Sequence, residues 1–305
     1  MTKVEKRKIF GLVIVLVGII IFMAPYVQIL KSNYDTKTET EIYQKNLENI
    51  NPKKSKELEK SIDKYNKSVV ENNSIMVDPF SVENYETKND IPKFKDDIYG
   101  FVIIPRLGEK LPLYLGASEE NLSKGLAHID GTSLPVGGNN SRSVIAGHRG
   151  YYRRMMLRYL DRVKKGDMLY IYSFGKRLEY RAFSSEEIFP SEKDKLNIME
   201  NEDVVTLLTC TPYPTNRKRL LVNFRRVNTS KSFDHKNEKN YQNKLVKDID
   251  KDLEKQSVDK DVNAKKRALN FTAIVSFIIA IGLIIKIIFI IYNARIREKR
   301  VKIND

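Results

Sequence analysis

VVTLLTC, residues 204–210, is an unbroken run of apolar and β-branched side chains that ends at the only cysteine of the 305-residue chain. Side chains of this kind at this density are typical of a β-strand. Residues 211–218 carry two prolines and an asparagine and predict a loop, after which residues 219–226 predict a second strand. We therefore expect Cys210 and Arg219 to lie near each other across a strand pair. A thiol beside a guanidinium is a candidate nucleophile beside an anion binder.

Short extended runs separated by Gly, Pro and Asn recur through the central part of the chain. They cover residues 98–105, 111–115, 143–146, 168–174, 178–185, 204–209 and 220–226. The dipeptide Gly175-Lys176 lies between two of these runs and predicts a hairpin. Many short strands at this spacing predict a mainly β fold, either a closed barrel or a sandwich. The central part, with roughly 150 residues, is large enough to bury a core, and a single cysteine excludes an intrachain disulfide.

Cys210 needs an activating partner if it is a nucleophile, because a free thiol with a pKa of about 8.5 is mostly protonated at neutral pH. His148 is the best candidate, since it follows a short apolar run and lies in a turn bracketed by glycines. His128 is flanked by apolar residues, where a packed and hydrogen-bonded ring is expected. His235 lies in a charged segment of low complexity. A lone cysteine is equally typical of a packed core side chain.

Four arginines compete for the position beside the thiol. Arg219 opens the second strand, and Arg217, Arg225 and Arg226 lie close to it in the sequence. With the two-residue period of a strand, Arg217, Arg219 and Arg225 share one face. Periodicity alone therefore leaves the choice of arginine open.

Three motifs in this order resemble those of the sortases, and specifically the pilus-assembling class C sortases. The cysteine motif is TLLTCTPY at residues 206–213, followed by Asn216 and by RLLV at residues 219–222. The histidine motif is IAGHRG at residues 145–150, and the loop before it is GTSLPVGG at residues 131–138. The resemblance runs from about residue 78 to about residue 227.

This resemblance implies a role for each of three residues. By it, Cys210 is the nucleophile, His148 is the general acid and base, and Arg219 positions substrate and stabilises the oxyanion of the tetrahedral intermediate. The motif match thus selects Arg219, although Lys218 stands where histidine is common in the family. A guanidinium offers forked donors and a permanent charge, and a donor aimed at an oxyanion contributes about 3 kcal/mol to acyl transfer. The resemblance also implies that thiolate and imidazolium coexist in only a minor fraction of molecules.

The same family implies the sortase β-barrel as the fold, with a helix over residues 151–163. MVDPFS at residues 76–81 resembles the lid that covers the active site in class C sortases. By this resemblance Asp78 faces the arginine, Pro79 shapes the turn, and Phe80 rests over the cysteine and shields it from water. The alternative is an ordinary turn, because Asp-Pro pairs commonly initiate turns.

Two long apolar runs flank the central part. As helices they reach about 33 to 36 Å, enough for a bilayer core of about 30 Å. Basic residues precede the first run and follow the second, so the positive-inside rule predicts a two-pass membrane protein with both termini in the cytoplasm and the catalytic domain outside. A cleaved signal peptide is the alternative for the first run. Lys286 lies inside the second run and is expected to snorkel toward the interface.

We divide the chain into a cytoplasmic N-terminus, a first span, a helical extracellular linker, a catalytic barrel with its lid, a charged tether, a second span and a basic cytoplasmic tail. In that order they cover residues 1–8, 9–30, 31–75, 76–228, 229–266, 267–293 and 294–305. The linker carries an apolar stripe at helical spacing, which predicts an amphipathic helix docked on the core. That stripe consists of Leu58, Ile62, Tyr65 and Val69. The tether has only a sparse stripe, so we expect it to be solvated with some helical tendency.

Charge and composition limit the classes of molecule that we expect the protein to bind. The net charge is +15, and the two basic ends account for part of it. Basic residues elsewhere are interspersed with acidic ones, so we expect no nucleic-acid partner but a surface near anionic lipid or cell-wall polymers. Asp161 and Asp167 have no acidic cluster with calcium-loop spacing around them. We therefore expect no metal and no cofactor.

The function expected from the resemblance is transpeptidation. Cys210 would cleave an LPXTG-like sorting signal between Thr and Gly and pass the acyl group to a lysine of a pilin subunit. Expected partners are pilins or surface proteins with such C-terminal signals, the membrane, and cell-wall precursors. The alternatives are a sortase that anchors proteins to peptidoglycan, a papain-like cysteine peptidase, and a non-enzymatic membrane scaffold. The papain-like mechanism would normally need a helix-borne cysteine and an orienting Asn or Asp.

Overall fold

The computed structural model describes residues 2–48, 50, 52–71, 76–87, 91–92, 98–151, 154–227 and 241–304. Contacts divide the chain into two compact units. One consists of Met1–Ser32 and Asn263–Asp305, and the other is Asn33–Val262. The second unit contains the barrel and all of the candidate site residues.

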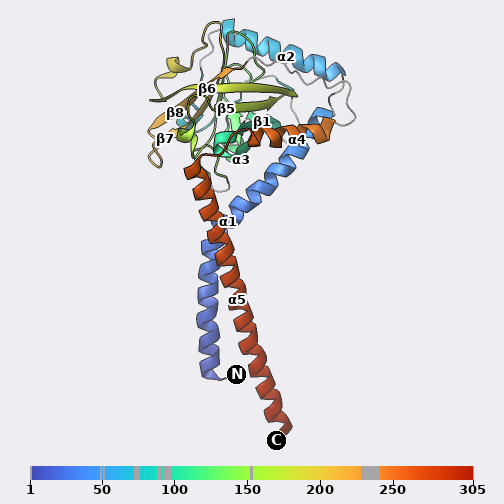
Figure 1. Cartoon of the computed structure of the whole chain (residues 1–305), viewed down its shortest axis with the longest axis vertical. Helices are drawn as coiled ribbons and strands as arrows, with labels where there is room; N and C mark the ends of the chain where they lie inside the picture. Colours follow the sequence, from blue (N-terminus) through green and yellow to red (C-terminus); the bar gives the residue numbers. More distant parts are fainter. Residues whose placement is uncertain are drawn as a thin grey trace. The chain divides into compact units, whose positions relative to one another are not determined.

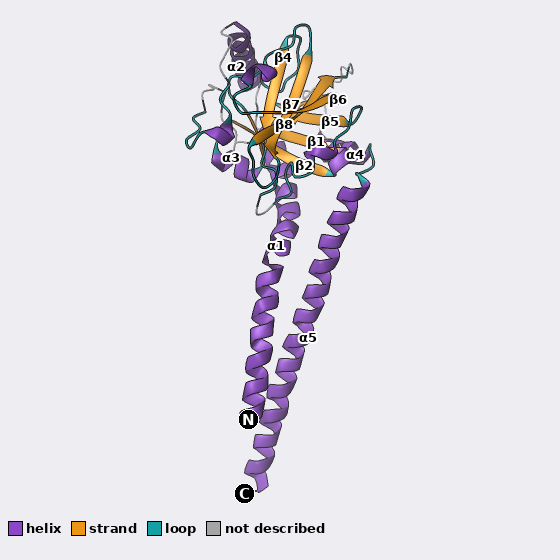
Figure 2. Ribbon diagram, turned by 90° about the vertical axis from the view of Figure 1, so that its left-hand side faces the viewer, coloured by secondary structure: helices purple, strands orange, loops and turns teal. Residues whose placement is uncertain are grey.

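In the described residues, eight strands close into a barrel (Figure 1). They are β1 (Ile98–Ile104), β2 (Glu109–Leu115), β3 (Leu126–His128), β4 (Ser141–Ala146), β5 (Met168–Ser173), β6 (Lys176–Ile188), β7 (Asp203–Thr211) and β8 (Lys218–Arg226). Their order around the barrel is β1-β2-β3-β4-β7-β8-β6-β5, and β1 closes it by pairing with β5. Neighbours are antiparallel except for the pairs β2 with β3 and β4 with β7. The expectation of a closed, mainly β barrel is confirmed (Figure 2).

The hairpin between β5 and β6 forms where the sequence predicted a turn. Ser173 pairs with Lys176, which leaves Phe174 and Gly175 as a two-residue loop. Both loop residues have positive φ, 49° and 76°, as in the type I′ turns that match the twist of antiparallel strands. The ring of Phe174 packs on that of Tyr99, 5.6 Å away.

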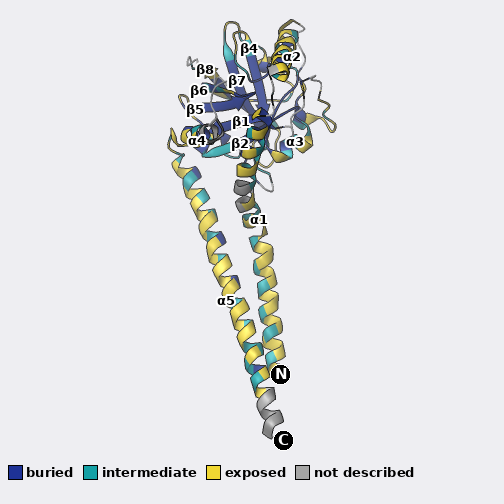
Figure 3. Ribbon diagram, turned by 90° about the vertical axis from the view of Figure 1, so that its right-hand side faces the viewer, coloured by how far each residue is buried: buried dark blue, intermediate teal, exposed yellow. Residues whose placement is uncertain are grey.

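Alternate residues of the strands build two separate apolar clusters. The first contains side chains from all eight strands, including Val102, Ile145 and Leu207. Because a closed barrel has one inner face, this cluster fills the barrel interior. The second holds residues of the opposite parity, such as Leu208, together with side chains of the surrounding helices, and so covers the outer face. The strands are accordingly buried on both faces (Figure 3).

Helices cover the outer face, as the apolar stripe of the linker predicted. In α1 (Lys3–Glu48), Tyr43 near the C-terminal end packs on the outer cluster. Pro52 is the first residue of α2 (Pro52–Glu71), a position where its missing N–H is harmless. Leu58 and Ile62 of α2 are buried in a third cluster against the barrel. The short helix α3 (Glu119–Lys124) lies between β2 and β3.

The helix expected over residues 151–163 is wrong. Among the described residues of that stretch, the only helical element is the 3-10 turn η4 (Leu160–Arg162). The backbones of Tyr151 and Arg154 form an isolated β-bridge instead. Met156 has a φ of 48°, which lies outside the α region and prevents a continuous helix. The remaining short 3-10 turns are η1 (Pro79–Ser81), η3 (Pro105–Leu107) and η5 (Lys193–Leu196).

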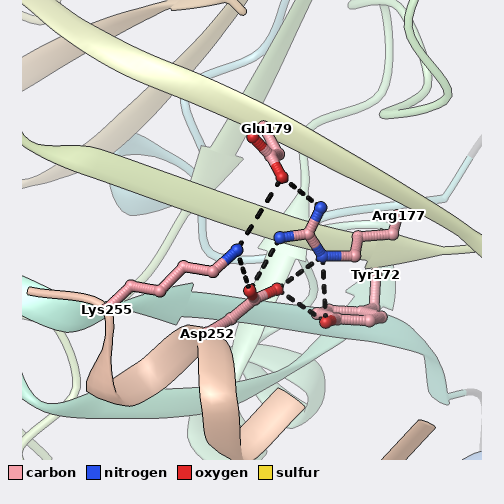
Figure 4. Close-up of polar contacts among 5 residues, drawn as sticks. All are labelled: Tyr172, Arg177, Glu179, Asp252 and Lys255. Atoms are coloured by element: carbon pink, nitrogen blue, oxygen red, sulfur yellow. Dashed lines mark hydrogen bonds and ion pairs between the residues drawn. The ribbon is translucent and has the colours of Figure 1, made fainter. Parts of the chain in front are cut away.

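Part of the segment expected to be a solvated tether is instead docked on the barrel. Residues 228–240 lie outside the described residues, but α4 (Tyr241–Glu254) buries Ile249 completely in the outer cluster. Asp252 of α4 is also buried, and Figure 4 shows it at the centre of a polar network. Nε and Nη2 of Arg177 donate to its carboxylate at 2.6 and 2.7 Å, and the Tyr172 hydroxyl donates at 2.6 Å.

Two further residues complete this network. Lys255 contacts the Asp252 carboxylate at 2.8 Å, and Arg177 is also paired with Glu179. Eight residues after Glu254, Val262 in the first turn of α5 (Lys260–Asn304) is fully buried in the barrel interior cluster. The chain is therefore held to the barrel by both charge and apolar packing up to residue 262.

Helices α1 and α5 contain the two apolar runs. The segments Lys3–Gln28 and Lys260–Arg297 are long and apolar enough to cross a membrane. Most of their large apolar side chains are exposed, for example Phe10, Ile21, Phe271 and Ile285. Exposed apolar side chains over such a length suggest that the protein is anchored in a membrane.

Candidate active site

Cys210 and Arg219 lie directly opposite each other in the antiparallel pair of β7 and β8. The loop that joins β7 to β8 carries two prolines and reverses the direction of the chain, as the sequence predicted. Both side chains are buried, with exposed fractions of 7% and 4%. Arg225 shares the parity of Arg219 but lies opposite Val204 at the far end of the strand pair. Of the four candidate arginines, Arg219 is the one placed across from the thiol.

The register between the parallel strands β4 and β7 positions His148. Ala146 is paired with Leu208, and the backbone N–H of Gly147 donates to the carbonyl of Leu208 at 3.0 Å. His148 follows Ala146 by two residues, as Cys210 follows Leu208, so the two functional residues lie at the same end of adjacent strands. Gly147 is needed here because a Cβ at this position would lie 2.3 Å from a methyl group of Leu126.

Strand parity places Cys210 and Arg219 on one face of the barrel. Ala146, Leu208 and Leu221 all belong to the outer cluster. Cys210 and Arg219 are each two residues away from one of these within a strand, so their side chains point to the same outer face. His148 lies beyond the end of β4, and the ring of Phe80 contacts both His148 and Arg219. The structure therefore brings together the three residues that the sequence motifs selected.

His148 is surrounded by two rings and one carboxylate. Its imidazole is stacked on Tyr151, with centroids 4.8 Å apart, and tilted against Phe80, with centroids 5.5 Å apart. Nε2 lies 3.5 Å from Oε1 of Glu119, a separation that permits an ion pair but is too long for a good hydrogen bond. Burial lowers the pKa of His148, and the Glu119 carboxylate only partly opposes this effect. The ring is therefore neutral at pH 7.

The N–H groups of Arg219 donate hydrogen bonds to other residues of the chain. Nε donates to Oδ2 of Asp78 at 2.9 Å, and Nη2 contacts the same oxygen at 2.9 Å. Nη2 also donates to Oγ of Ser81 at 3.1 Å. Nη1 donates to the carbonyl oxygens of Asn216 and Lys218 at 3.0 and 3.1 Å. The guanidinium is thus held between its own loop and the segment around Asp78, whose side chain is almost fully buried.

The segment of residues 78–81 is both a turn and a partner of the arginine. The Asp78 carboxylate caps η1, because Oδ1 accepts from the N–H of Phe80 at 3.1 Å and Oδ2 accepts from the hydroxyl of Ser81 at 2.7 Å. Pro79 is buried at the first position of η1. The ring of Phe80 lies over the Arg219 guanidinium, 5.5 Å from its central carbon. Its ring contacts are therefore with Arg219 and His148, the two residues that flank Cys210.

The electrostatics of this arrangement keep the thiol protonated. The pKa of Cys210 is raised to about 11, mainly by burial; the Arg219 guanidinium opposes this shift, the Asp78 carboxylate adds to it, and Arg149 opposes it slightly. The thiol and the neutral imidazole of His148 are thus both uncharged at pH 7. A thiolate forms more readily if the Asp78 carboxylate moves away and Arg219 stays.

Several contacts of the site could not be read from the motifs. Glu119 reaches His148 from α3, and the motifs give no signal for it. Arg149 follows the histidine directly and donates from Nη1 to Oγ1 of Thr211 at 2.7 Å and from Nη2 to Asp161 at 2.9 Å. Asp161 therefore has an arginine partner. Within the residues that the structure describes, no cluster of three or more His, Cys, Asp or Glu side chains is arranged to hold a metal ion.

Of the other two histidines, His128 lies within the described residues. His128 on β3 is fully buried, and its Nε2 is 3.0 Å from the carbonyl oxygens of both Thr132 and Ser133. The packed, hydrogen-bonded ring that the sequence predicted is therefore confirmed. His235 falls outside the described residues.

Comparison with known proteins places this geometry in a family. A family model, the Sortase domain, matches residues 102–227. Sortase A of Bacillus anthracis is 29% identical over 130 residues, which are 42% of this chain and 59% of that protein. The aligned part therefore spans less than two thirds of that relative.

Solved structures match over a longer stretch. Sortase C-3 from Streptococcus pneumoniae is 36% identical with a TM-score of 0.60, covering 69% of this chain and 98% of that one. Sortase C1 of Streptococcus agalactiae is 32% identical with a TM-score of 0.57, covering 68% and 99%. Since about a third of the residues are identical over nearly the full length of these structures, the chain belongs to the sortase family.

Proposed function

We propose that this protein is a membrane-anchored cysteine transpeptidase of the class C, pilus-assembling type. It cleaves an LPXTG-like sorting signal between Thr and Gly and joins the acyl group to a lysine amine of a pilin subunit. The observation that carries the proposal is the position of Cys210, with Arg219 opposite it on one neighbouring strand and His148 beside it at the end of the other. The similarity to sortase C structures, one of them from a streptococcal pilus island, supports the pilin as substrate.

In the first half-reaction Cys210 is the nucleophile and His148 moves the proton. The imidazole takes the thiol proton, the thiolate attacks the scissile carbonyl, and a tetrahedral oxyanion forms. The C–N bond then breaks, and His148 returns its proton to the departing amine of glycine. In the second half-reaction the neutral acceptor amine attacks the thioester, His148 takes its proton, and the thiol is regenerated when the C–S bond breaks.

Arg219 stabilises the oxyanion in both half-reactions. A guanidinium is always charged and presents several N–H groups in a fixed plane. Removing one donor from an acyl-transfer site typically costs about 3 kcal/mol of transition-state stabilisation. In the structure these donors are occupied by Asp78, Ser81 and two backbone carbonyls, so substrate must displace at least the first two.

Residues 76–81 therefore act as a lid, and the name is used below for this segment. Asp78 fills the place of a substrate oxygen at Arg219, and Phe80 shields the site between His148 and Arg219. Shielding favours transfer to an amine over hydrolysis, because water has restricted access to the thioester until an acceptor arrives. The proposal requires the lid to leave the guanidinium in each catalytic cycle.

Anchoring to peptidoglycan uses the same residues with a cell-wall amine as acceptor, and it is the second candidate. The lid contact at Arg219 and the second apolar helix favour the pilin acceptor. The papain-like mechanism is less favoured, because Cys210 lies near the end of a strand rather than on a helix.

The test is to incubate the full-length protein in detergent micelles with a pilin that carries a sorting signal, and to sequence the cross-linked peptides by mass spectrometry. We expect isopeptide bonds between Thr of the signal and a lysine of another pilin. The same reaction with Cys210→Ala should give none. If a cell-wall precursor with a free amine is added to the same incubation, its linkage to Thr in preference to lysine would instead support the peptidoglycan acceptor. Release of free acid without any transfer would overturn transpeptidation.

We further propose that both termini are cytoplasmic and the barrel is outside. Basic residues cluster at both ends, next to the apolar segments of α1 and α5. The test uses Cys210→Ala protein with one new cysteine, either Thr2→Cys or Lys176→Cys, in intact protoplasts. An impermeant maleimide should label the second and not the first, and labelling of Thr2→Cys would contradict this topology.

A further inference from the structure

A cavity of about 250 Å³ lies on the outer face of the barrel, beside β4 and away from the thiol. One wall is Val69 of α2 and Met76 at the start of the lid, and another is Thr132 in the loop before β4. Lys193 and Asp194 of η5 contribute charged groups to its rim, and both are exposed. The remaining polar group is the side chain of Arg142 on β4, which is only 5% exposed.

Arg142 is a buried cation whose hydrogen-bond partners are all uncharged. Nε donates to the Thr206 hydroxyl at 3.0 Å, Nη1 to the Asn197 carbonyl at 3.0 Å, and Nη2 to Oδ1 of Asn223 at 2.8 Å. Within the described part of the chain, no carboxylate lies within ion-pair distance of this guanidinium. Its burial lowers the pKa of Arg142 to about 10, with Glu186 the only carboxylate that measurably opposes the shift.

A buried arginine without a counter-ion is unusual, because the cost of removing the charge from water is normally offset by a paired anion. Four other arginines whose side chains are largely buried illustrate the contrast. Each of these has a carboxylate: Arg219 with Asp78, Arg154 with Glu39, Arg177 with Asp252, and Arg149 with Asp161. Arg142 departs from this pattern, and its guanidinium adjoins the cavity.

We propose that this cavity is a carboxylate-binding site whose anion is held by Arg142. The three bonds described above leave two of the five N–H groups of the guanidinium, one on each terminal nitrogen, for a ligand. Two N–H groups suit the two oxygens of one carboxylate. Lys193 adds positive charge at the rim, while Asp194 makes the site less suited to a dianion such as phosphate.

The position of the site relative to Cys210 suggests where the carboxylate comes from, and this step rests on the proposed function. Thr206, which binds Arg142, precedes Cys210 by four residues on β7 and points to the same face. Four residues of a strand span about 13 Å. Met76 of the cavity wall belongs to the lid, so once the lid has moved an extended peptide with its scissile bond at Cys210 would place a side chain about four residues away at the cavity. The ligand is then an acidic residue of the substrate near the sorting signal.

The alternative role for Arg142 is purely structural. Its three bonds join β4 to β7, β8 and the segment after η5, and such a cross-link needs no ligand. The two roles differ in one observable property. Only a carboxylate site binds a small anion in a manner that depends on both Arg142 and the open cavity.

The first experiment uses trifluoroacetate as the probe and the full-length protein in micelles, in a chloride-free buffer. We expect the wild-type protein to broaden the ¹⁹F signal of the probe and Arg142→Gln to lose at least half of that broadening. Ile198→Trp, which fills the cavity but leaves the bonds of Arg142 in place, should lose it as well. Arg225→Gln, which changes an exposed arginine on β8 outside the cavity lining, is the matched control and should behave like wild type. Equal broadening in all four proteins would overturn the proposal.

The second experiment identifies the source of the carboxylate. Peptides with one LPXTG-like signal carry a single Asp, or Asn as its neutral twin, either at X of the signal or outside the signal within six residues of the scissile bond. Their binding to Cys210→Ala protein is measured by fluorescence anisotropy. We expect one position at which Asp binds at least about ten-fold more tightly than Asn, and loss of that preference in Arg142→Gln.

The outcomes of the two experiments are separable. An Asp-to-Asn ratio near one at every position, with ¹⁹F broadening that still depends on Arg142, supports the site and overturns the peptide as its source. If none of the peptides binds, the proposed function fails, and the ¹⁹F measurement alone still decides whether Arg142 holds an anion.

Discussion

The carboxylate of Asp78 and the guanidinium of Arg219 form a buried ion pair, with Nε donating to Oδ2 at 2.9 Å although 141 residues separate them in the sequence. The pair occupies the donors that an acyl-transfer oxyanion would require. In the proposed mechanism the structure therefore corresponds to a closed state, in which the chain itself fills the anion site beside Cys210.

Opening the lid should expose the thiol. We expect Asp78→Asn and Phe80→Ala each to raise the rate of Cys210 alkylation by iodoacetamide about ten-fold, because each removes a contact that holds the lid closed. Glu83→Gln, an exposed carboxylate just after the lid, is the control and should leave the rate unchanged. Unchanged rates in both lid variants would show that residues 76–81 do not cover the thiol.

The pH dependence of alkylation should report the charges around Cys210. Since burial and Asp78 raise the pKa of the thiol to about 11, the wild-type rate should still be rising at pH 10. Asp78→Asn removes a negative charge, so the midpoint of its alkylation rate against pH should move to lower pH. Arg219→Gln removes a positive charge, so its midpoint should move to higher pH. A shift in the opposite direction for either variant would contradict this electrostatic account.

Arg219 should matter for turnover more than for substrate binding. Arg219→Lys keeps a positive charge but loses the planar set of donors, so we expect kcat to fall about 10²- to 10³-fold with a smaller change in KM. Arg225→Lys, at the other end of the same strand, should keep kcat within about two-fold, the scale of a surface change. Equal losses in the two variants would remove Arg219 from the proposed oxyanion site.

The α4 network should contribute to stability. Asp252→Asn leaves the buried Arg177 with a weaker partner, and breaking a buried pair in this way typically costs about 3 kcal/mol. Asp250→Asn is the matched control, because the Asp250 side chain is 56% exposed in its pair with Lys110 and such pairs contribute about 0 to 1 kcal/mol. Urea unfolding of the full-length protein, followed by tyrosine fluorescence, should separate the two variants. Similar midpoints would show that the network contributes little.

Acid should destabilise the protein partly through His148. Burial lowers the pKa of this histidine in the folded state below its usual value of about 6.5. The unfolded chain therefore takes up a proton that the folded chain does not, so the stability is present above pH 6.5 and declines as the pH falls below it. His148→Gln should make the melting temperature less dependent on pH between 7 and 5. His128 is also buried with a lowered pKa, so some dependence should remain.

Local pattern predicted most of the barrel because alternation and turn chemistry act over a few residues. All seven predicted runs are strands, and the hairpin at Gly175 is where the turn residues placed it. The strand β3 was missed because it has only three residues and gains its stability from pairing with β2 and β4. The helix expected over residues 151–163 failed for a related reason, since the bridge from Tyr151 to Arg154 competes with helical hydrogen bonds.

The sequence pattern did not predict the contacts between distant segments. The cysteine, histidine and arginine motifs pointed to residues that the structure brings together. Glu119 beside His148 and Asp252 beside Arg177 depend on how helices dock, and docking is decided by packing rather than by local sequence. The sparse apolar stripe of α4 gave no sign of the buried carboxylate, because the sequence alone does not show which residue an acidic side chain pairs with.

Val262 couples the C-terminal helix mechanically to the core of the barrel. Its side chain is packed inside the barrel, and the very next residue begins the other compact unit. Because α5 runs unbroken from Lys260 through Val262, a pull on this helix acts directly on a core side chain rather than on a loop.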